Sequence, residues 1–524
     1  MIAKRNQLFK LSSAVLACAV ISACSSDNSG VNLNSGTPSS GSADVSKFVS
    51  IGDSLTAGVA DGALYLLGQT NSYPNILAQQ FADADGVAVD FTQPLATTDL
   101  GGFLVAGMTG ILENRLVLNT NPDPSVEDER PSPERLAGDP TEEVIGSGLN
   151  GTTFNNVGVP DAKSFHLGAV GFGDPGPGPG SFIGVSSNPY FVRFTIDPVN
   201  SSVIADAAAQ QPSFYTMWIG NNDVLSFATS GGIGVDQLGN FDPSSYGPND
   251  ITDPTAFGGV YAGLVGAMKA ANPAVQGVLI NIPDVSTIPF FTTVAFNPVP
   301  LDQTSADGLN AAFAAYNGGL VAAQGAAFIT AEEVAQRTIT FIAGETNALL
   351  ILDEDLTDIT ALNPALINLR QATANDLVLL TTGAKIGELV DENDDPLDPT
   401  SPRWGVSGPL VDGDVLTATE VGLVNTARTA FNATIKAAAD ADSNLAFFDA
   451  AAVMAQLQAS GIDFGTGSVN SDFATGGAFG LDGVHPTGRG YAVIANEIID
   501  VINTAFDANV HKVDPAQFPT IFLK

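Results

Sequence analysis

Segments typical of strands and segments typical of helices alternate along most of the chain, and this alternation constrains the fold most strongly. Short apolar runs predict strands at residues 47–51, 153–157, 214–219, 275–282 and 445–448. Apolar residues at helical spacing predict helices at about residues 71–81, 203–210, 256–271, 309–324, 418–439, 451–459 and 492–502. Strands that alternate with helices favour a parallel sheet covered on both faces. We therefore expect an α/β protein.

The chain is longer than such a core requires, and the surplus is expected as large loop insertions at about 93–150, 167–198, 226–253 and 288–403. Within the last of these, the stretch Thr338–Thr382 carries apolar runs such as Ala348–Leu352. These runs predict an ordered insertion or small subdomain. Because loops often carry function, the insertions could form a substrate pocket or a lid. The sequence equally permits that they contribute nothing to a site.

A serine follows the first predicted strand. The motif Gly52–Leu55 comes directly after the apolar run Phe48–Ile51, and Ser54 is its third residue. Open α/β sheets bind their ligands at the carboxyl ends of the strands, which is where this serine is expected. Glycine at position 52 permits a sharp turn without a side-chain clash. Taken alone, the motif also fits a plain turn at a strand end.

A histidine and an aspartate lie three residues apart near the C-terminus, at Asp482 and His485. One loop can therefore carry a general base together with the carboxylate that fixes the imidazole tautomer. The alternative is a capping or buried histidine. The other two histidines, His166 in a glycine-rich loop and His511 in a polar tail, have no carboxylate at a useful spacing. His485 is thus the predicted base.

The motif Gly220–Asp223 follows another apolar run. Asn222 has two interpretations: it caps the next helix or turn, or its amide donates to the negative charge that develops on an attacked carbonyl. Asp223 is expected to be structural. With Ser54 and His485, Asn222 completes the parts needed for acyl transfer by a serine nucleophile.

These motifs resemble the sequence blocks of the SGNH hydrolases, also called GDSL esterases and lipases. The resemblance implies a three-layer α/β/α flavodoxin-like fold with a parallel central sheet, Ser54 as nucleophile, and Asp482 with His485 as its partners. Residues Asn156–Asp161 resemble the second block, so the implied oxyanion hole consists of Ser54, Asp161 and Asn222. The family usually has glycine at the position of Asp161. A carboxylate there would oppose an oxyanion unless it points away.

The function implied by the resemblance is a serine esterase or lipase that hydrolyses carboxylic esters through an acyl-enzyme on Ser54. Its substrate would be a small-molecule or lipid ester, and neither a metal nor an organic cofactor is expected. One alternative is a surface lipoprotein that kept the fold as a binding module without catalysis, which the aspartate at position 161 favours. A further alternative is a carbohydrate O-deacetylase, because the same fold and residues serve acetyl esters on sugars.

Residues 1–23 are typical of a signal peptide. Three cations, Lys4, Arg5 and Lys10, precede the apolar stretch Leu11–Ile21, which is too short to span a bilayer. Small residues then lead to Cys24. The segment is therefore expected to be a targeting sequence that is removed, rather than part of the fold.

The end of this segment resembles a bacterial lipoprotein signal, in which Cys24 would carry the lipid anchor. Ser25 follows the cysteine, and by resemblance this favours the outer membrane of a Gram-negative bacterium. The alternative is an ordinary secretory signal with an incidental cysteine. Residues 24–43 are rich in Ser, Gly, Asn and Thr and predict a flexible tether, which leaves residues 44–524 for the hydrolase domain.

The chain is strongly acidic. It has 19 Lys and Arg against 56 Asp and Glu, a formal net charge of −37. Such a charge repels nucleic acids and anionic membranes, so we expect neither as a partner apart from the lipid anchor. Its two cysteines are Cys18 and Cys24, so removal of the signal leaves no intramolecular disulfide.

Two further motifs are not expected to bind a ligand. Residues Gly171–Gly176 match a dinucleotide fingerprint, but the Pro-Gly run at 177–180 cannot open the helix that binds the pyrophosphate. Residues Asp391–Asp395 begin like a calcium loop, but Pro396 occupies the position of the required glycine. A solvated acidic loop is the better interpretation.

Overall fold

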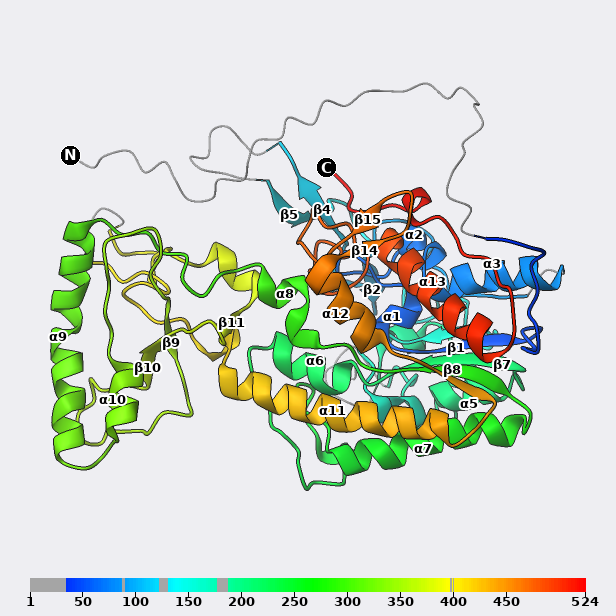
Figure 1. The fold of residues 1–524 in the computed structure, drawn as a ribbon, viewed down its shortest axis with the longest axis horizontal. Coiled ribbons are helices and arrows are strands. Elements are labelled where there is room, and N and C mark those ends of the chain that lie inside the picture. Colours follow the sequence, from blue (N-terminus) through cyan, green and yellow to red (C-terminus); the bar gives the residue numbers. More distant parts are fainter. Residues whose placement is uncertain (1–33, 87–89, 122–130, 177–186, 396–397, 399) are drawn as a thin grey trace. The chain divides into compact units, whose positions relative to one another are not determined.

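The computed structural model describes residues 34–86, 90–121, 131–176, 187–395, 398 and 400–524. The described residues form two compact units (Figure 1). The larger, here called the sheet unit, comprises residues 34–295, 375–385 and 411–524. The smaller, here called the insertion unit, comprises residues 296–374 and 386–410.

The sheet unit is built on five parallel strands in the order β13-β8-β7-β1-β6. Their bounds are β1 (Phe48–Gly52), β6 (Asn156–Gly158), β7 (Phe214–Trp218), β8 (Gln276–Ile280) and β13 (Leu445–Phe448). The predicted parallel sheet is confirmed. From β1 the chain first adds β6 on one side and then crosses to add β7 on the other, so the strand order reverses beside β1.

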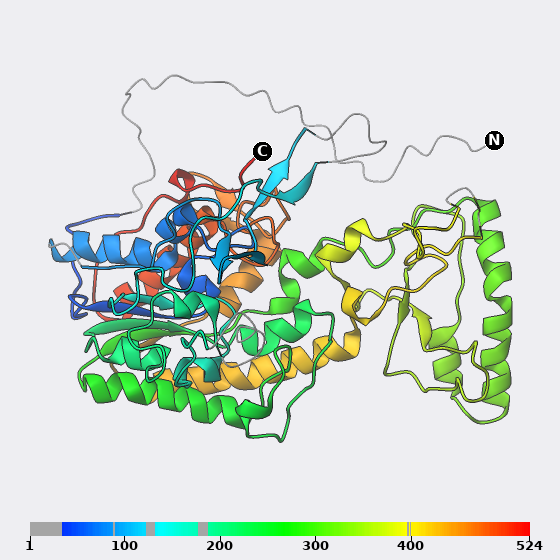
Figure 2. The same ribbon diagram turned by 180° about the vertical axis from the view of Figure 1, so that it is seen from behind.

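Helices cover both faces of this sheet, as Figures 1 and 2 show from opposite sides. Alternate residues of each strand point to opposite faces, and they fall into two separate hydrophobic clusters. Tyr215 and Met217 of β7 belong to one cluster, whereas Phe214 and Trp218 belong to the other. The first cluster involves α5 (Val203–Ala208), α7 (Pro254–Ala271) and α11 (Ala418–Asp440); the second involves α3 (Tyr73–Asp85) and α13 (Gly488–Ala505).

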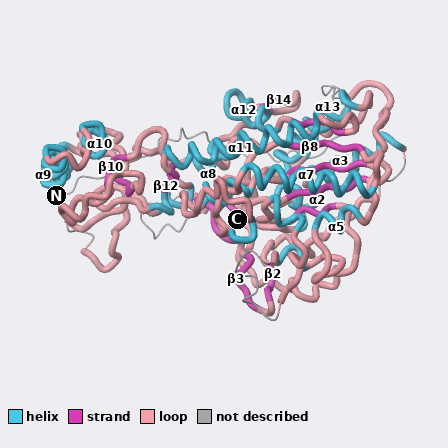
Figure 3. The backbone as a smooth tube through the Cα atoms, turned by 90° about the horizontal axis from the view of Figure 1, so that it is seen from below, coloured by secondary structure: helices cyan, strands magenta, loops and turns pink. Residues whose placement is uncertain are grey.

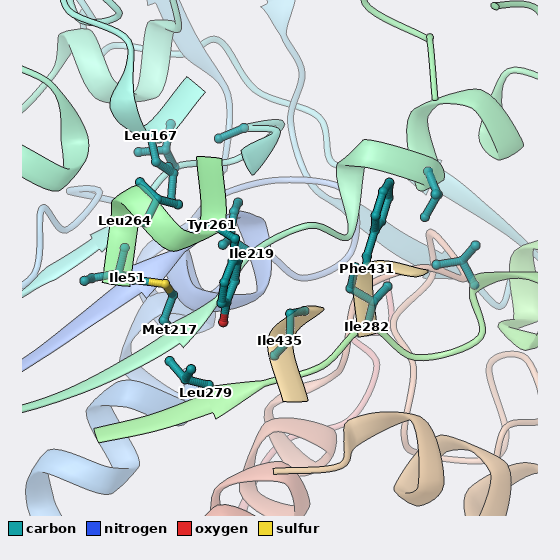
Figure 4. Packing of buried hydrophobic residues seen from close by; sticks show 14 of the residues in the cluster. Ile51, Leu167, Met217, Ile219, Tyr261, Leu264, Leu279, Ile282, Phe431 and Ile435 are labelled. Carbon is teal, nitrogen blue, oxygen red and sulfur yellow. The ribbon is translucent and has the colours of Figure 1, made fainter. Parts of the chain in front are cut away.

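Figure 4 shows the first cluster, in which Met217 and Leu279 of the sheet lie beside side chains of α7 and α11. Phe257 of α7 and Phe431 of α11 stack with their ring centroids 4.2 Å apart. Burying each large apolar side chain contributes about 1.5–3 kcal/mol. This packing fixes α7 and α11 on the sheet, and with it the strand ends that carry polar residues.

Most predicted elements are present, with shifts of three to six residues at the starts of α9 (Gln303–Gly325), β6 and α13. The helix predicted from residue 309 is α9, and it begins earlier because the Asp302 carboxylate accepts a hydrogen bond from the Ser305 N–H. The strand predicted at 153–157 was wrong at its start, since β6 begins at Asn156. The backbone N–H of Asn155 instead donates to the Thr92 carbonyl, in a contact between two loops.

The insertion unit has a core of its own around Tyr316, Leu320 and Leu369. It contains α9, α10 (Ala331–Arg337) and the antiparallel pair β9 (Leu350–Leu352) and β10 (Leu369–Gln371). Arg337 is fully buried and donates to the Ile367 carbonyl at 2.6 Å. The expected subdomain at Thr338–Thr382 falls largely within this unit, but the ordered segment begins at 296 and excludes residues 375–385.

The remaining helices and strands are mostly short, and long loop segments connect them, as Figure 3 shows. The helices are α1 (Ser54–Ala57), α2 (Leu66–Thr70), α4 (Pro189–Val192), α6 (Asn222–Thr229), α8 (Pro289–Thr292) and α12 (Ala450–Ser460). The strands are β2 (Phe103–Val105), β3 (Met108–Leu112), β4 (Leu116–Asn119), β5 (Ser132–Arg135), β11 (Leu377–Val378), β12 (Val415–Leu416), β14 (Ile462–Asp463) and β15 (Ser468–Val469).

Part of the predicted tether is bound to the sheet unit. Ser39 and Asn509 exchange two backbone hydrogen bonds, and the Asn34 side chain donates to the Lys512 carbonyl. The tether predicted for residues 24–43 was therefore too long, because these polar side chains and backbone groups find partners near the C-terminus. Residues 24–33, the predicted signal and its Cys24 lie outside the described residues. Among the helices that the structure describes, none has the length and apolarity needed to cross a bilayer.

Candidate active site

Two of the predicted site residues lie at the carboxyl ends of neighbouring strands. Ser54 is the first residue of α1, two residues after β1, and Asn222 is the first residue of α6, four residues after β7. Strands β1 and β7 pair in parallel with Gly52 opposite Trp218. This edge is also where the strand order reverses, the place at which open α/β sheets form their ligand crevice.

The structure brings Ser54, His485 and Asp482 together in one chain of hydrogen bonds. His485 Nε2 lies 2.9 Å from Ser54 Oγ, and His485 Nδ1 lies 2.7 Å from Asp482 Oδ2. The carboxylate accepts the Nδ1–H, which leaves Nε2 as the acceptor for the serine hydroxyl. A hydroxyl held in this way can lose its proton to the imidazole as it attacks. The side chains of His485 and Asp482 are only 17% and 13% exposed.

The Asp482 carboxylate is held by four N–H groups. One oxygen accepts from the backbone N–H groups of Val484 and His485, each at 2.9 Å. The other accepts from the His485 ring and from the Gly62 backbone N–H, each at 2.7 Å. Because both oxygens accept two hydrogen bonds each, the carboxylate is fixed in one orientation. It is therefore well suited to orient the imidazole.

The pKa values in the relay move in opposite directions. Burial alone would raise the pKa of Asp482, but the His485 charge and the hydrogen bonds from the His485 ring and from the Val484 and His485 backbone hold it below its ordinary value. Burial alone would lower the pKa of His485, but the Asp482 carboxylate, and then Asp161 and Asp53, raise it. The protonated form of His485 is thus stabilised by three carboxylates.

Two glycines allow the close approach of these segments. Gly52 has ordinary backbone angles, but a Cβ there would come within 2.3 Å of the Trp218 carbonyl oxygen. The glycine is thus required by the contact between β1 and β7 rather than by a sharp turn. Gly483 has a φ of +70°, and a Cβ would come within 2.9 Å of the Phe290 backbone nitrogen in α8. Only glycine fits this second position.

Two backbone N–H groups near the relay are free. Ser54 begins α1, so its N–H has no partner within the helix. In the described part of the chain, neither the Ser54 N–H nor the Asp161 N–H donates to a protein group. The Asn222 side-chain amide donates one N–H to the Ala162 carbonyl at 3.0 Å, and its second N–H remains available to donate to a ligand. This last bond connects Asn222 to the turn that carries Asp161.

Asp161 differs from the usual glycine in both backbone and charge. Its φ is +64°, in the left-handed region that glycine adopts readily and aspartate tolerates. The side chain is exposed, yet surrounding protein is dense enough that desolvation raises the pKa of its carboxyl, against the opposing effect of His485. The charge of this carboxylate acts on the histidine.

Sequence reasoning missed two buried aspartates that support the relay. Asp53 accepts from the Leu55 N–H at 3.0 Å and from the Asn221 side chain at 2.8 Å, and burial raises its pKa to about 6. Asp61 accepts from the Leu481 N–H at 2.9 Å and from the Tyr65 hydroxyl. Asp53 lies inside the Gly52–Leu55 motif, which could have indicated it. No sequence motif around Asp61 indicates a role for that residue.

The other histidines have different surroundings. His166 is buried and stacks on Phe172 with ring centroids 4.7 Å apart, and burial lowers its pKa to about 3. The Nδ1 of His511 lies 3.7 Å from a carboxylate oxygen of Asp83. Asp83 is distant in sequence, which spacing could not reveal. The Asp223 carboxylate accepts hydrogen bonds from the backbone N–H and the hydroxyl of Ser164, which is the structural role that was predicted. Its partner is Ser164, however, and not the turn in which Asp223 itself lies.

Comparisons of the chain with protein-family models, with curated proteins and with solved structures find no match.

Proposed function

We propose that this protein is a serine ester hydrolase of the SGNH type, with a flavodoxin-like fold. The observation that carries the proposal is the hydrogen-bonded relay of Ser54, His485 and Asp482, with successive distances of 2.9 and 2.7 Å. The strand order supports the fold assignment. Counted along the chain, the five core strands lie in the order 2-1-3-4-5, which is the flavodoxin-like order.

In the proposed reaction the Ser54 oxygen bonds to the ester carbonyl carbon while its proton moves to His485 Nε2. The carbonyl oxygen becomes an oxyanion, and the free N–H groups of Ser54 and Asp161 with the Asn222 amide would bind it. The alcohol then leaves with the proton from His485. Water repeats the sequence on the acyl-enzyme and releases the acid.

The test is the Ser54→Ala variant with a short nitrophenyl ester. We expect kcat/KM to fall at least about 10⁴-fold, because the nucleophile is lost. Ser46→Ala is a matched control, since Ser46 is exposed and lies before β1. Thermal unfolding should show that both variants remain folded. A folded Ser54→Ala protein with wild-type activity would refute the proposal.

Asp161 favours a second candidate, a binding module that no longer catalyses ester hydrolysis. Its charge lies near the place where an oxyanion would form and raises the pKa of His485. A fluorophosphonate probe separates the two candidates. Covalent labelling that disappears in Ser54→Ala and in His485→Ala supports the hydrolase, whereas absence of labelling in the folded wild-type protein supports the binding module.

We further propose that the protein is exported and anchored to the outer membrane through a lipid on Cys24. The support is the signal-like pattern of residues 1–23 and the small residues before the cysteine. Cys24→Ser should release the protein from the membrane fraction and abolish incorporation of labelled palmitate. A serine variant that stays in the membrane fraction would contradict the anchor.

A further inference from the structure

Residues 519–524, here called the strap, run from α13 to β4 within the sheet unit, and their last part lies beside β4 in Figure 1. At one end a backbone N–H of α13, that of Arg489, donates to the first carbonyl of the strap at 2.9 Å. At the other end the Leu118 N–H donates to the Phe522 carbonyl at 2.8 Å, and the Lys524 N–H donates to the Leu118 carbonyl at 3.0 Å. The strap therefore pairs in parallel with β4 and is held at both ends.

Phe522 connects the strap to the interior. It is half-buried and packs against a small hydrophobic cluster of Ala60, Ala63 and Tyr65. The Arg115 guanidinium lies over both aromatic rings, 4.3 Å from the centroid of Phe522 and 5.1 Å from that of Tyr65. Arg115 is only 9% exposed, and its Nη1 has no hydrogen-bond partner among the described residues. The two ring faces therefore offset part of the cost of burying its charge.

Tyr65 joins Phe522 to the loop that carries the relay. The two rings meet edge to face, with their centroids 6.3 Å apart. The Tyr65 hydroxyl donates to one oxygen of the buried Asp61 carboxylate at 2.9 Å. The other oxygen accepts from the backbone N–H of Leu481, the residue before Asp482, at 2.9 Å. Two side chains, those of Tyr65 and Asp61, thus link Phe522 to the Asp482 loop.

The peptide bond between Asp61 and Gly62 reaches the relay directly. Its carbonyl accepts from the N–H of Leu116 in β4 at 2.8 Å, and its N–H donates to Asp482 Oδ2 at 2.7 Å. Because a peptide bond is planar, fixing the carbonyl also fixes the direction of the N–H. Asp482 Oδ2 is the oxygen that lies 2.7 Å from His485 Nδ1. A displaced peptide bond would therefore change the orientation of the imidazole.

We propose that the strap positions the carboxylate of the relay, and that Phe522 and Arg115 are its positioning residues. Phe522 holds Arg115 and Tyr65, the strap backbone holds β4, and both paths end at the peptide bond that fixes Asp482 Oδ2. The inference rests on the proposed function, because it concerns the same relay. It adds two residues that act through Asp482 rather than on the substrate.

Phe522→Ala tests the strap on a short nitrophenyl ester. Losing the ring frees Arg115 and Tyr65, so we expect kcat to fall about 10–100-fold with little change in KM, because a misplaced imidazole slows proton transfer more than it weakens substrate binding. Phe522→Tyr keeps the ring and should keep the wild-type rate. Phe518→Ala is the matched control, since Phe518 is also half-buried and directly precedes the strap but packs against the cluster under α13. It should lower thermal stability by a similar amount without slowing the reaction.

A spectroscopic measurement follows the relay itself. The Nδ1–H that His485 donates to Asp482 gives a proton NMR resonance far downfield. Phe522→Ala should move or broaden this resonance, whereas Phe518→Ala should leave it in place. A mere loss of stability would not change it in the folded protein. Arg115→Met keeps an apolar stem and removes the guanidinium, so it should shift the same resonance and guards against a folding defect in Phe522→Ala.

The outcomes keep the two proposals apart. If the wild-type protein hydrolyses the ester through Ser54, but folded Phe522→Ala and Arg115→Met keep its kcat and its downfield resonance, the strap proposal fails and the hydrolase stands. Equal losses of kcat in Phe522→Ala and Phe518→Ala would also overturn it, because they would show a general loss of stability. If hydrolysis and fluorophosphonate labelling are both absent, the hydrolase fails and the resonance alone decides the strap. A shift in Phe522→Ala but not in Phe518→Ala then supports the strap, and no shift overturns it.

Discussion

Two loops bring a carboxylate to act on His485, and they hold it in different ways. On the C-terminal loop, Asp482 accepts four hydrogen bonds, including one from the His485 ring. On the turn after β6, the Asp161 side chain has no hydrogen-bond partner among the described residues and lies exposed. Both carboxylates raise the pKa of His485.

The difference separates orientation from charge. Asp482 fixes which ring nitrogen carries the proton, because its oxygen is itself fixed by the Gly62 N–H and by two N–H groups of its own loop. Asp161 acts on His485 only through the electrostatic field of its charge. A carboxylate near the His485 imidazole can therefore act on it in two unequal ways, by orienting it or by its charge, and substitution by asparagine distinguishes them.

The largest effect is expected from Asp482→Asn. The asparagine NH₂ group can only donate, so where it faces Nδ1 it favours the tautomer that carries its proton on Nε2. Nε2 then cannot accept the serine proton, and kcat/KM should fall about 10⁴-fold at neutral pH. Asp161→Asn serves as the matched control, since it removes the same charge from the same histidine without a hydrogen bond. Initial rates on a short nitrophenyl ester test this. Equal losses in both variants would break the comparison.

Another buried carboxylate, that of Asp61, extends the comparison to the stability of the protein rather than the reaction rate. Asp61 is 1% exposed and supports the Asp482 loop through the Leu481 N–H. Burial, together with the neighbouring charge of Asp482, raises its pKa from 3.8 to about 6. The folded protein thus keeps a proton that the unfolded chain releases, so this contribution to the free energy of unfolding is present below about pH 4 and is lost as pH rises through 6.

Between pH 4 and pH 8 the wild-type protein should therefore lose on the order of 2–3 kcal/mol more stability than Asp61→Asn. Urea unfolding at several pH values measures the difference. Asp507→Asn is the control, because Asp507 is exposed and has the same φ of +50° as Asp61. If Asp61→Asn keeps the wild-type pH dependence, its carboxyl does not hold the extra proton.

The sequence predicted the parallel sheet and the three relay residues because their signals are local. Ser54 follows an apolar run directly, and Asp482 and His485 lie three residues apart. The supporting contacts were out of reach because they join distant positions. Leu481 meets Asp61 across 420 residues, and Asn221 meets Asp53 across 168. Such pairings depend on the packing of whole elements, which no local pattern encodes.

The same limit explains the errors at element ends. The start of α9 depends on one capping aspartate, Asp302, whereas the start of β6 depends on a loop contact between Asn155 and Thr92. Apolar periodicity identifies the middle of a helix or strand, but its ends are set by single hydrogen bonds. The tether was predicted too long for a related reason, since residues 34–42 are polar in composition but hydrogen-bonded.

The smallest effect is expected from Asp161→Asn itself, and it has a definite sign. His485 must be neutral to accept the serine proton, so kcat/KM falls as pH drops through the pKa of His485. Asp161 raises that pKa, so its removal should move the acidic limb of the profile to lower pH and leave the variant more active than wild type near pH 6. Without the carboxylate opposing the oxyanion, the plateau should also rise, by up to about tenfold.

Asp161→Gly separates the backbone from the charge. Glycine removes the same carboxylate and also relieves the left-handed φ of +64°, which asparagine retains. If charge alone matters, the two variants should share one pH–rate profile, with glycine differing only in thermal stability. A profile that shifts in Asp161→Gly but not in Asp161→Asn would show that turn geometry, rather than the field on His485, sets the activity. A shift toward higher pH in both would contradict the assigned role of Asp161.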